Sequence, residues 1–301
     1  MKKTTTDKLG TSNEMNFVFL GTSNFSIIVL DELKRAGFIP ELIVTQEDKP
    51  KGRHLVLTPP PVKVWAQNNK ITYLQPTTLK NSELIKQLSV VGYKLFIVAS
   101  YGKIIPQEII DIPEHKTLNV HPSLLPRLRG PSPIQSAILE EDETGVTIMR
   151  LDNKMDEGPI VAQKKVTITD WPPYANELED VLAHEGGKLL VEMIPDWIVG
   201  KIKEKIQDES LATYCKKIDK NDALINLDDP ATENLKKIRG YAGWPNAYTH
   251  FNHLGKNLRL IIKRARIENG KLILERVIPE GKKEMDFEDF KHGFLPKEKT
   301  N

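Results

Sequence analysis

The sequence predicts an α/β protein with a mostly parallel, doubly wound sheet, followed by a small all-β domain. Three observations carry this prediction. Short apolar strand patterns alternate with helical patterns from residue 16 onward. A nearly unbroken apolar run, Leu95–Ser100, has the composition of a central strand buried on both faces. Beyond residue 245, short strand patterns at close spacing favour a small β-barrel.

The N-terminal region opens as a βαβ unit. The strand Asn16–Gly21 ends in glycine, a helical pattern runs on to Leu33, and the strand Leu42–Thr45 follows. This opening is typical of a Rossmann-like sheet. The segment Gly21–Asn24 lacks the glycines with which a dinucleotide-binding turn approaches a pyrophosphate, so we exclude dinucleotide binding. A long basic loop at 46–61 comes next, and loops of this length are usually functional or disordered.

The later elements are expected in regular succession. Two strands, Val146–Leu151 and Pro159–Ile168, are joined by a short turn and form an antiparallel hairpin at the sheet edge. A long amphipathic helix over Tyr174–Val199 follows. We place an extension at residues 1–15 that we expect to be disordered, one domain at 16–205 and a second at 206–301. The remaining expected elements are helices at Val62–Gln67, Glu83–Leu88, Ile134–Leu139 and around Leu235, and strands at Thr72–Leu74, Thr117–His121, Ala247–Phe251, Leu258–Arg264 and Lys271–Val277.

Composition describes an ordinary soluble protein. Of 301 residues, 39% are hydrophobic and 28% charged, and no apolar run is long enough to span a membrane. Cys215 is the sole cysteine, which excludes an internal disulfide and suits a reducing cytoplasm. The net charge is only +2, but the stretch Lys256–Lys283 is locally basic. This stretch is either a footprint for a polyanion or a solvated strand surface.

The chemistry-bearing residues gather around the strand Thr117–His121. Because side chains two apart on a strand share a face, Asn119 and His121 lie side by side where the strand ends. Taken alone, these two residues also fit local structural roles in a turn. The acids within reach are Asp152, Asp156 and Glu157, in the turn of the edge hairpin. A second histidine pair, His250-x-x-His253, has no third ligand beside it, so we expect no metal site.

Several motifs resemble the formyltransferases that use 10-formyltetrahydrofolate. They are Asn119-x-His121, Ser123-Leu-Leu-Pro126, Arg129-Gly130, Thr144-Gly-Val-Thr-x-Met149 and Met155-Asp-x-Gly158. Further motifs are similar to the branch of that family that acts on methionyl-tRNA: Phe19-Leu-Gly-Thr22, Lys49-Pro-Lys-Gly-Arg53, Pro61-Val-Lys-Val64, Ala99-x-Tyr-Gly102, Trp244-Pro245 and Glu280-Gly-Lys-Lys283.

This resemblance implies a formyltransferase catalytic domain at 16–205 and an OB-like tRNA-binding domain at 206–301. The β-barrel of the second domain lacks one or two of the strands expected from the family. The implied activity is transfer of the formyl group of 10-formyltetrahydrofolate to the amino group of methionyl initiator tRNA. A cytoplasmic monomer without metal or membrane contact is expected. The alternatives are a sugar N-formyltransferase acting on a nucleotide-linked amino sugar, and a catalytically inactive folate- or RNA-binding protein.

Formyl transfer to an amine passes through a tetrahedral intermediate with a negative oxygen, so the site needs preorganised donors. Asn119 can supply an uncharged N–H, and His121 can donate to the oxyanion and handle the amine proton. Asp156 would hold the imidazole or polarise a water. The resemblance assigns folate binding to Ser123, Leu124, Leu125, Pro126, Tyr101, Gly102, Ile104 and Met155. The candidate tRNA contacts are Arg53 first, then Lys49, Lys51, Lys263 and Arg264.

Overall fold

The computed structural model describes residues 15–52 and 55–294 of the chain. The extension expected at residues 1–15 lies outside the described residues apart from Met15. The chain forms two compact units. The first comprises Met1–Arg129, Gly145–Val166 and Asp180–Thr213, and the second comprises Gly130–Thr144, Thr167–Glu179 and Tyr214–Asn301.

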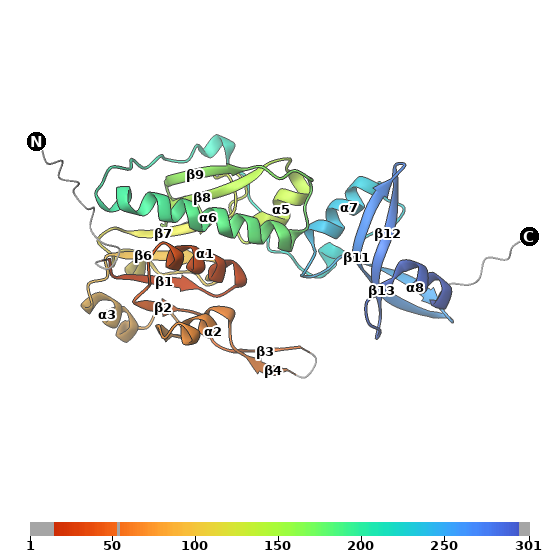
Figure 1. Cartoon of the computed structure of the whole chain (residues 1–301), viewed down its shortest axis with the longest axis horizontal. Coiled ribbons are helices and arrows are strands. Elements are labelled where there is room, and N and C mark those ends of the chain that lie inside the picture. Colours follow the sequence, from red (N-terminus) through yellow and green to blue (C-terminus); the bar gives the residue numbers. More distant parts are fainter. Residues whose placement is uncertain (1–14, 53–54, 295–301) are drawn as a thin grey trace, which may run out of the picture. The chain divides into compact units, whose positions relative to one another are not determined.

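A seven-stranded sheet forms the centre of the first unit (Figure 1). Its strands, in spatial order, are β5 (Thr72–Leu74), β2 (Leu42–Val44), β1 (Phe17–Gly21), β6 (Leu95–Ala99), β7 (Thr117–His121), β8 (Thr144–Arg150) and β9 (Ile160–Val166). The pairings from β5 to β7 are parallel, and β8 runs antiparallel to β7. This arrangement confirms the predicted mostly parallel sheet, with β8 and β9 as the pair at its edge.

Helices cover both faces of this sheet, as the doubly wound prediction requires. They are α1 (Asn24–Arg35), α2 (Pro61–Asn68), α3 (Ser82–Val90), α4 (Gln107–Ile110) and most of α6 (Ala175–Ile198). Strands β1 and β6 are buried along their whole length, since parallel strands under two helical layers have no solvent face. A Cβ added to Gly186 of α6 would lie 2.6 Å from Val120 Cγ1. This glycine therefore lets α6 pack directly on β7, the strand that ends in His121.

The prediction of a loop over residues 46–61 is wrong in one respect, because part of this segment forms a β-hairpin. Strands β3 (Lys49–Lys51) and β4 (Val56–Thr58) pair antiparallel, with Lys49 opposite Thr58 (Figure 1). Gly52 begins the turn in the left-handed conformation, at φ +72°. Because Lys and Pro make up β3, its composition gave no strand signal.

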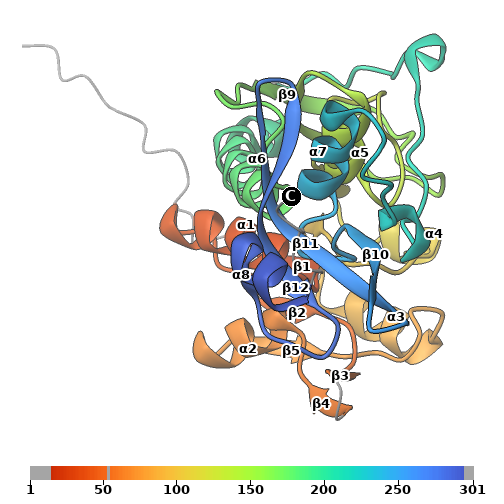
Figure 2. The ribbon, with the colours of Figure 1, turned by 90° about the vertical axis from the view of Figure 1, so that its right-hand side faces the viewer.

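The second unit contains a four-stranded antiparallel sheet in the order β10 (Tyr248–His253), β11 (Lys256–Glu268), β12 (Lys271–Pro279) and β13 (Met285–Asp286). Helices α5 (Pro133–Glu140), α7 (Ala231–Gly240) and α8 (Phe287–Phe294) belong to the same unit (Figure 2). Its core includes Ile238 of α7, Leu260 and Ile262 of β11, and Phe290 of α8. The first three strands were predicted, whereas β13 and α8 were not.

Candidate active site

The predicted catalytic pair lies at the carboxyl end of β7, where doubly wound sheets bind their ligands. Asn119 is paired with Val98 of β6 on one side and with Met149 of β8 on the other. His121 is 4% exposed, while Asn119 is intermediate in exposure. The Asn119 side chain makes no hydrogen bond to any residue that the structure describes. Its amide is therefore available to a ligand at the end of the strand.

The contacts of His121 fix the roles of its two ring nitrogens. Nε2 lies 3.1 Å from the carbonyl oxygen of Leu128. Because a carbonyl can only accept, Nε2 carries the proton in the neutral ring. Nδ1 then has the free lone pair, and it lies 3.8 Å from Oδ1 of Asp156. His121 can thus accept a proton at Nδ1, and the Asp156 carboxylate would stabilise the imidazolium that results.

The structure distinguishes among the three acids in the β8–β9 connection. The Asp152 carboxylate accepts a hydrogen bond from the backbone N–H of Lys154 at 2.9 Å, and Glu157 pairs with the Lys154 ammonium at 3.2 Å. Asp156 alone of these acids faces His121. Its backbone is left-handed, at φ +55°, a conformation that Asp tolerates better than most residues. This unusual conformation helps to aim the carboxylate at the ring.

The segment Ser123–Pro126 is held by hydrogen bonds of its own. The Ser123 hydroxyl donates to the Arg127 carbonyl at 2.7 Å. The backbone N–H of Leu125 donates to the Thr147 hydroxyl at 3.2 Å, and the Gln163 amide donates to the Leu125 carbonyl at 2.8 Å. The side chains of Ser123 and Leu125 are buried. Leu124 and Pro126 are half-buried, so they are the members of the segment whose side chains reach the surface.

Two of the residues predicted to bind folate are apolar and exposed. Ile104, after β6, is 89% exposed, and Met155, after β8, is 58% exposed. Exposed apolar side chains beside a polar site are a typical feature of ligand-binding surfaces. Tyr101 differs, because it is 2% exposed and packs in the core. Burial, together with nearby Glu47, raises the pKa of its hydroxyl to about 12.

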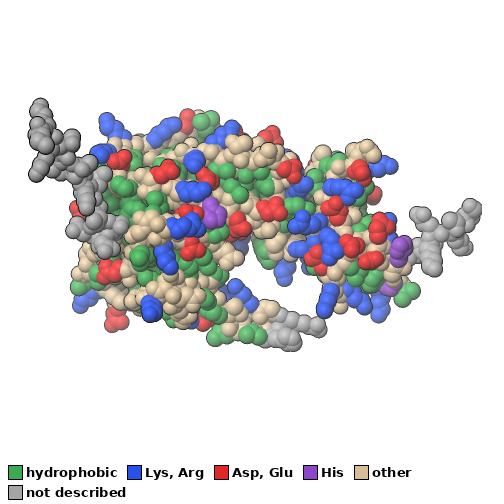
Figure 3. Space-filling view, viewed as in Figure 1, with side chains coloured by type: hydrophobic (Ala, Val, Ile, Leu, Met, Phe, Trp, Pro, Cys, Tyr) green, Lys and Arg blue, Asp and Glu red, His purple; other side chains and the backbone are tan. Residues whose placement is uncertain are grey.

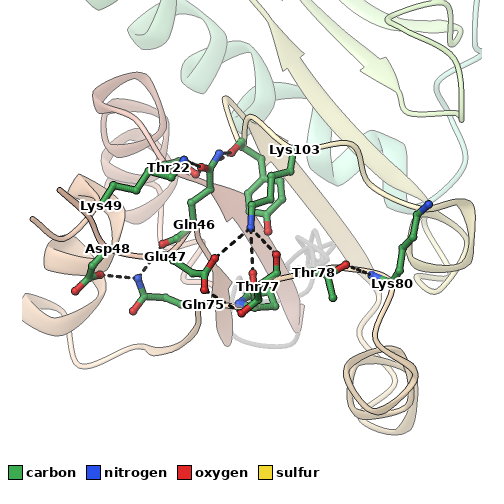
Figure 4. A network of polar contacts seen from close by, with 12 residues as sticks. Thr22, Gln46, Glu47, Asp48, Lys49, Gln75, Thr77, Thr78, Lys80 and Lys103 are labelled. Atoms are coloured by element: carbon green, nitrogen blue, oxygen red, sulfur yellow. Dashed lines mark hydrogen bonds and ion pairs between the residues drawn. The ribbon is translucent and has the colours of Figure 1, made fainter. Parts of the chain in front are cut away.

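A polar network that the sequence did not reveal joins the loops after β2, β5 and β6 (Figure 4). The buried amide of Gln46 donates to the Tyr101 carbonyl at 2.6 Å and accepts from the Lys49 ammonium at 2.6 Å. Gln75 donates to the Gln46 carbonyl at 2.8 Å. A Cβ on Gly102 would lie 2.7 Å from the Gln46 amide nitrogen. The base of the β3–β4 hairpin is thus tied to the strand end that carries Gly102. In the sequence, this polar network was indicated only by a polar residue directly after a buried parallel strand.

The candidate tRNA contacts are distributed over both units. Lys49 and Lys51 are exposed on β3, and Arg53 lies outside the described residues. In the second unit the Lys263 ammonium donates to the Asn246 side chain at 2.7 Å, and Arg264 is exposed on β11.

Part of the basic stretch at 256–283 is neutralised within the second unit. Arg266 pairs with Glu275 at 2.8 Å, and Arg276 pairs with Asp286 at 2.8 Å. Figure 3 shows acidic side chains lying among the basic ones on this part of the surface. The net positive potential of this sheet is therefore lower than its count of Lys and Arg implies.

Metal sites and membrane-spanning helices were also looked for among the described residues. Among them, no group of three or more His, Cys, Asp or Glu residues is placed to hold a metal ion. Within residues 15–52 and 55–294, no helix has the length and apolar character needed to cross a membrane.

Together, an uncharged amide, a proton-accepting imidazole and a carboxylate at the end of a doubly wound sheet suit the transfer of an acyl group to a nucleophile. The chain belongs to the formyl transferase family. The sequence model of that family matches residues 15–194, and the sequence model of its C-terminal domain matches residues 217–271. The family uses 10-formyltetrahydrofolate as its formyl donor, which confirms the donor predicted from the motifs.

Curated relatives and solved structures agree with this assignment. A methionyl-tRNA formyltransferase of Chloroflexus aggregans is 43% identical over 250 residues, covering 82% of this chain and 79% of the relative. The methionyl-tRNA formyltransferase of Bacillus subtilis is 37% identical over 300 residues, covering 92% and 94%. Among solved structures, a methionyl-tRNA formyltransferase from Clostridium thermocellum has a TM-score of 0.58 at 20% identity, covering 88% of this chain and 98% of that chain. A sugar N-formyltransferase from a Shewanella species has a TM-score of 0.63 at 17% identity, covering 84% and 99%.

Proposed function

We propose that this protein transfers the formyl group of 10-formyltetrahydrofolate to the amino group of methionyl initiator tRNA. The observation that carries the proposal is the similarity to the Bacillus subtilis enzyme, 37% identical over 92% of this chain and 94% of the relative. That similarity extends through both units. The likeness to the sugar N-formyltransferase, at 17% identity, concerns the fold alone. We expect the enzyme to act as a monomer in the cytoplasm.

In the proposed reaction the methionyl amine attacks the formyl carbon. A carbon–nitrogen bond forms to the amine, the formyl oxygen becomes an oxyanion, and the bond from the formyl carbon to N10 of the folate then breaks. Asn119 donates an N–H to the oxyanion. His121 takes the amine proton at Nδ1, and N10 of the leaving folate receives it. Asp156 stabilises the imidazolium between these two transfers, which the 3.8 Å separation of Nδ1 and Oδ1 permits.

The folate is proposed to bind between the loops that follow β6, β7 and β8. Ile104 and Met155 supply apolar surface for the pterin, and the backbone of Tyr101 and Gly102 lies beside Ile104 in the chain and borders the same space. The segment Ser123–Pro126 borders the same space, and the bonds that fix it preorganise the site.

The acceptor tRNA is proposed to contact the β3–β4 hairpin of the first unit and β11 of the second. Lys49 and Lys51 are exposed cations on β3, and they suit phosphate contacts. Arg53, which lies outside the described residues, is the first candidate for this contact on the grounds of the family resemblance. On β11, Lys263 and Arg264 are the corresponding candidates.

The decisive test compares amine acceptors with the purified protein and 10-formyltetrahydrofolate. We expect formyl incorporation into methionyl-tRNA and none into nucleotide-linked amino sugars. Turnover of the amino sugar alone would replace this proposal with the sugar N-formyltransferase reading. Folate binding without transfer to either acceptor would support the catalytically inactive alternative.

A further inference from the structure

A glutamine far along the chain contacts the loop that carries Asp156. Gln207 is 5% exposed and lies in the segment that follows α6. Its amide nitrogen donates to the Asp156 carbonyl at 2.8 Å and to the Gly158 carbonyl at 2.7 Å. Both amide hydrogens of one side chain are therefore used on the backbone of the proposed catalytic loop.

Arg129 determines which way the Gln207 amide points. Its Nε and Nη2 donate to the Gln207 amide oxygen at 3.0 and 2.9 Å. Because a guanidinium can only donate, the amide oxygen must face Arg129 and the NH₂ group must face the loop. Arg129 is 0% exposed, and it also donates two hydrogen bonds to the Glu209 carboxylate at 2.9 and 2.7 Å. A buried guanidinium is costly unless its donors are satisfied, so this geometry is strongly constrained.

The same segment supports the residue that holds His121. The Thr213 hydroxyl accepts from the Leu128 N–H at 2.9 Å, and the Thr213 carbonyl accepts from the Arg129 N–H at 2.9 Å. Leu128 is left-handed, at φ +59°, and its carbonyl is the one that orients the His121 ring. Residues 207–213 thus fix backbone on both sides of the His121–Asp156 pair.

We propose that Gln207, oriented by Arg129, is a positioning residue that sets the Asp156 carboxylate against His121. The inference rests on the proposed function, in which that pair moves the amine proton. Asp156 and Leu128 both have positive φ, so each needs external bonds to stay in place. Displacing a catalytic group by about 1 Å can cost on the order of 100-fold in rate. Gln207 touches neither substrate nor reacting atoms in this account.

The test variant is Gln207→Glu, because a carboxylate keeps its attraction to Arg129 but has no hydrogen to give the two carbonyls. Gln87→Glu is the matched control, since it makes the same chemical change at an exposed position of α3. We expect Gln207→Glu to lower kcat between about 10- and 100-fold with the KM for 10-formyltetrahydrofolate unchanged, and the control to keep full activity. An unchanged kcat would overturn the proposal.

A double-mutant cycle separates positioning from a general loss of fold. In an Asp156→Asn background, Gln207→Glu should lower the residual rate less than about 3-fold, because the carboxylate it positions is gone. Retention of the full loss in that background would overturn the proposal.

A second measurement needs no acceptor and keeps the inference separate from the proposed function. Hydrogen exchange of the peptide over residues 151–159 should be faster in Gln207→Glu than in the wild type or in Gln87→Glu. Unchanged exchange there would overturn the inference even if the wild type formylates methionyl-tRNA. If exchange is faster in Gln207→Glu while the wild type is inactive on every acceptor, the proposed function is wrong but the positioning of the Asp156 loop by Gln207 is still supported.

Discussion

Replacing Asn119 by alanine tests the proposed oxyanion donor with little disturbance to the fold. The side chain is intermediate in exposure and makes no hydrogen bond to the part of the chain that the structure describes. The backbone pairings of this residue with Val98 and Met149 do not depend on the side chain. We therefore expect the free energy of unfolding to change by less than about 1 kcal/mol.

The expected effect on catalysis is much larger. Loss of one preorganised oxyanion donor costs about 10²–10³ in kcat, or about 3–4 kcal/mol of transition-state stabilisation. The formyl oxygen carries little charge in the ground state, so the KM for 10-formyltetrahydrofolate should stay within about 2-fold of the wild type. The effect of Asn119→Ala should therefore fall on kcat alone.

Single-turnover formylation of methionyl-tRNA measures the effect on the rate of formyl transfer, and a thermal melt of each protein measures the effect on stability. Asn68→Ala, at an exposed position of α2, is the matched control and should behave as the wild type. A fall in kcat of less than about 10-fold with an unchanged melting temperature would refute the role of Asn119.

Three further predictions concern acceptor binding and stability. Removing Lys49 and Lys51 together should raise the KM for methionyl-tRNA and reduce its salt dependence by about 0.7–0.9 in log–log slope per lost phosphate contact, and an unchanged slope would contradict the contact. Burial alone would raise the pKa of Glu32, but hydrogen bonds from Arg35 and His184 outweigh it and hold the pKa below its ordinary value of 4.5. The ionised form therefore stabilises the fold above pH 4.5, and this contribution is lost as the pH falls through the lowered value. Melts of Glu32→Gln should thus lie below the wild type near neutral pH and converge with it in acid. The buried Tyr101 hydroxyl has no hydrogen-bond partner among the described residues, so Tyr101→Phe should leave the free energy of unfolding unchanged or raise it by up to about 1 kcal/mol, measured in urea.

The fold was predictable where local composition and burial agree. The strands Thr72–Leu74 and Thr117–His121 were predicted with the bounds that the structure gives them. In both cases a short apolar or β-branched run ends next to a polar or proline residue, so pattern and pairing coincide. The β3–β4 hairpin was not predicted, because its exposed Lys-Pro-Lys strand is stabilised by pairing and turn geometry and its composition does not favour a strand.

From the sequence, only the part of the site that lies on the single strand β7 was predictable. The periodicity of β7 put Asn119 and His121 on one face, a purely local argument. Sequence reasoning left Asp152, Asp156 and Glu157 open until the family resemblance favoured Asp156. The choice depends on a left-handed backbone at Asp156 and on local partners for the other two acids. These are three-dimensional facts that spacing alone does not encode.

The hydrogen bonds from Gln207 to the Asp156 loop show why a change in sequence pattern is a poor guide to where a site ends. The predicted domain limit at 205 followed such a change, and the contacts of Gln207 with Asp156 and of Thr213 with Leu128 lie beyond it. Arg129 and Gln207 are 78 positions apart, and neither belongs to a periodic pattern. A chain ended at residue 205 would remove Gln207 and Glu209 from a guanidinium that is 0% exposed. Leaving a buried charge without such partners costs several kcal/mol. The segment 207–213 therefore belongs to the support of the proposed site, because Gln207 donates to the carbonyls of Asp156 and Gly158.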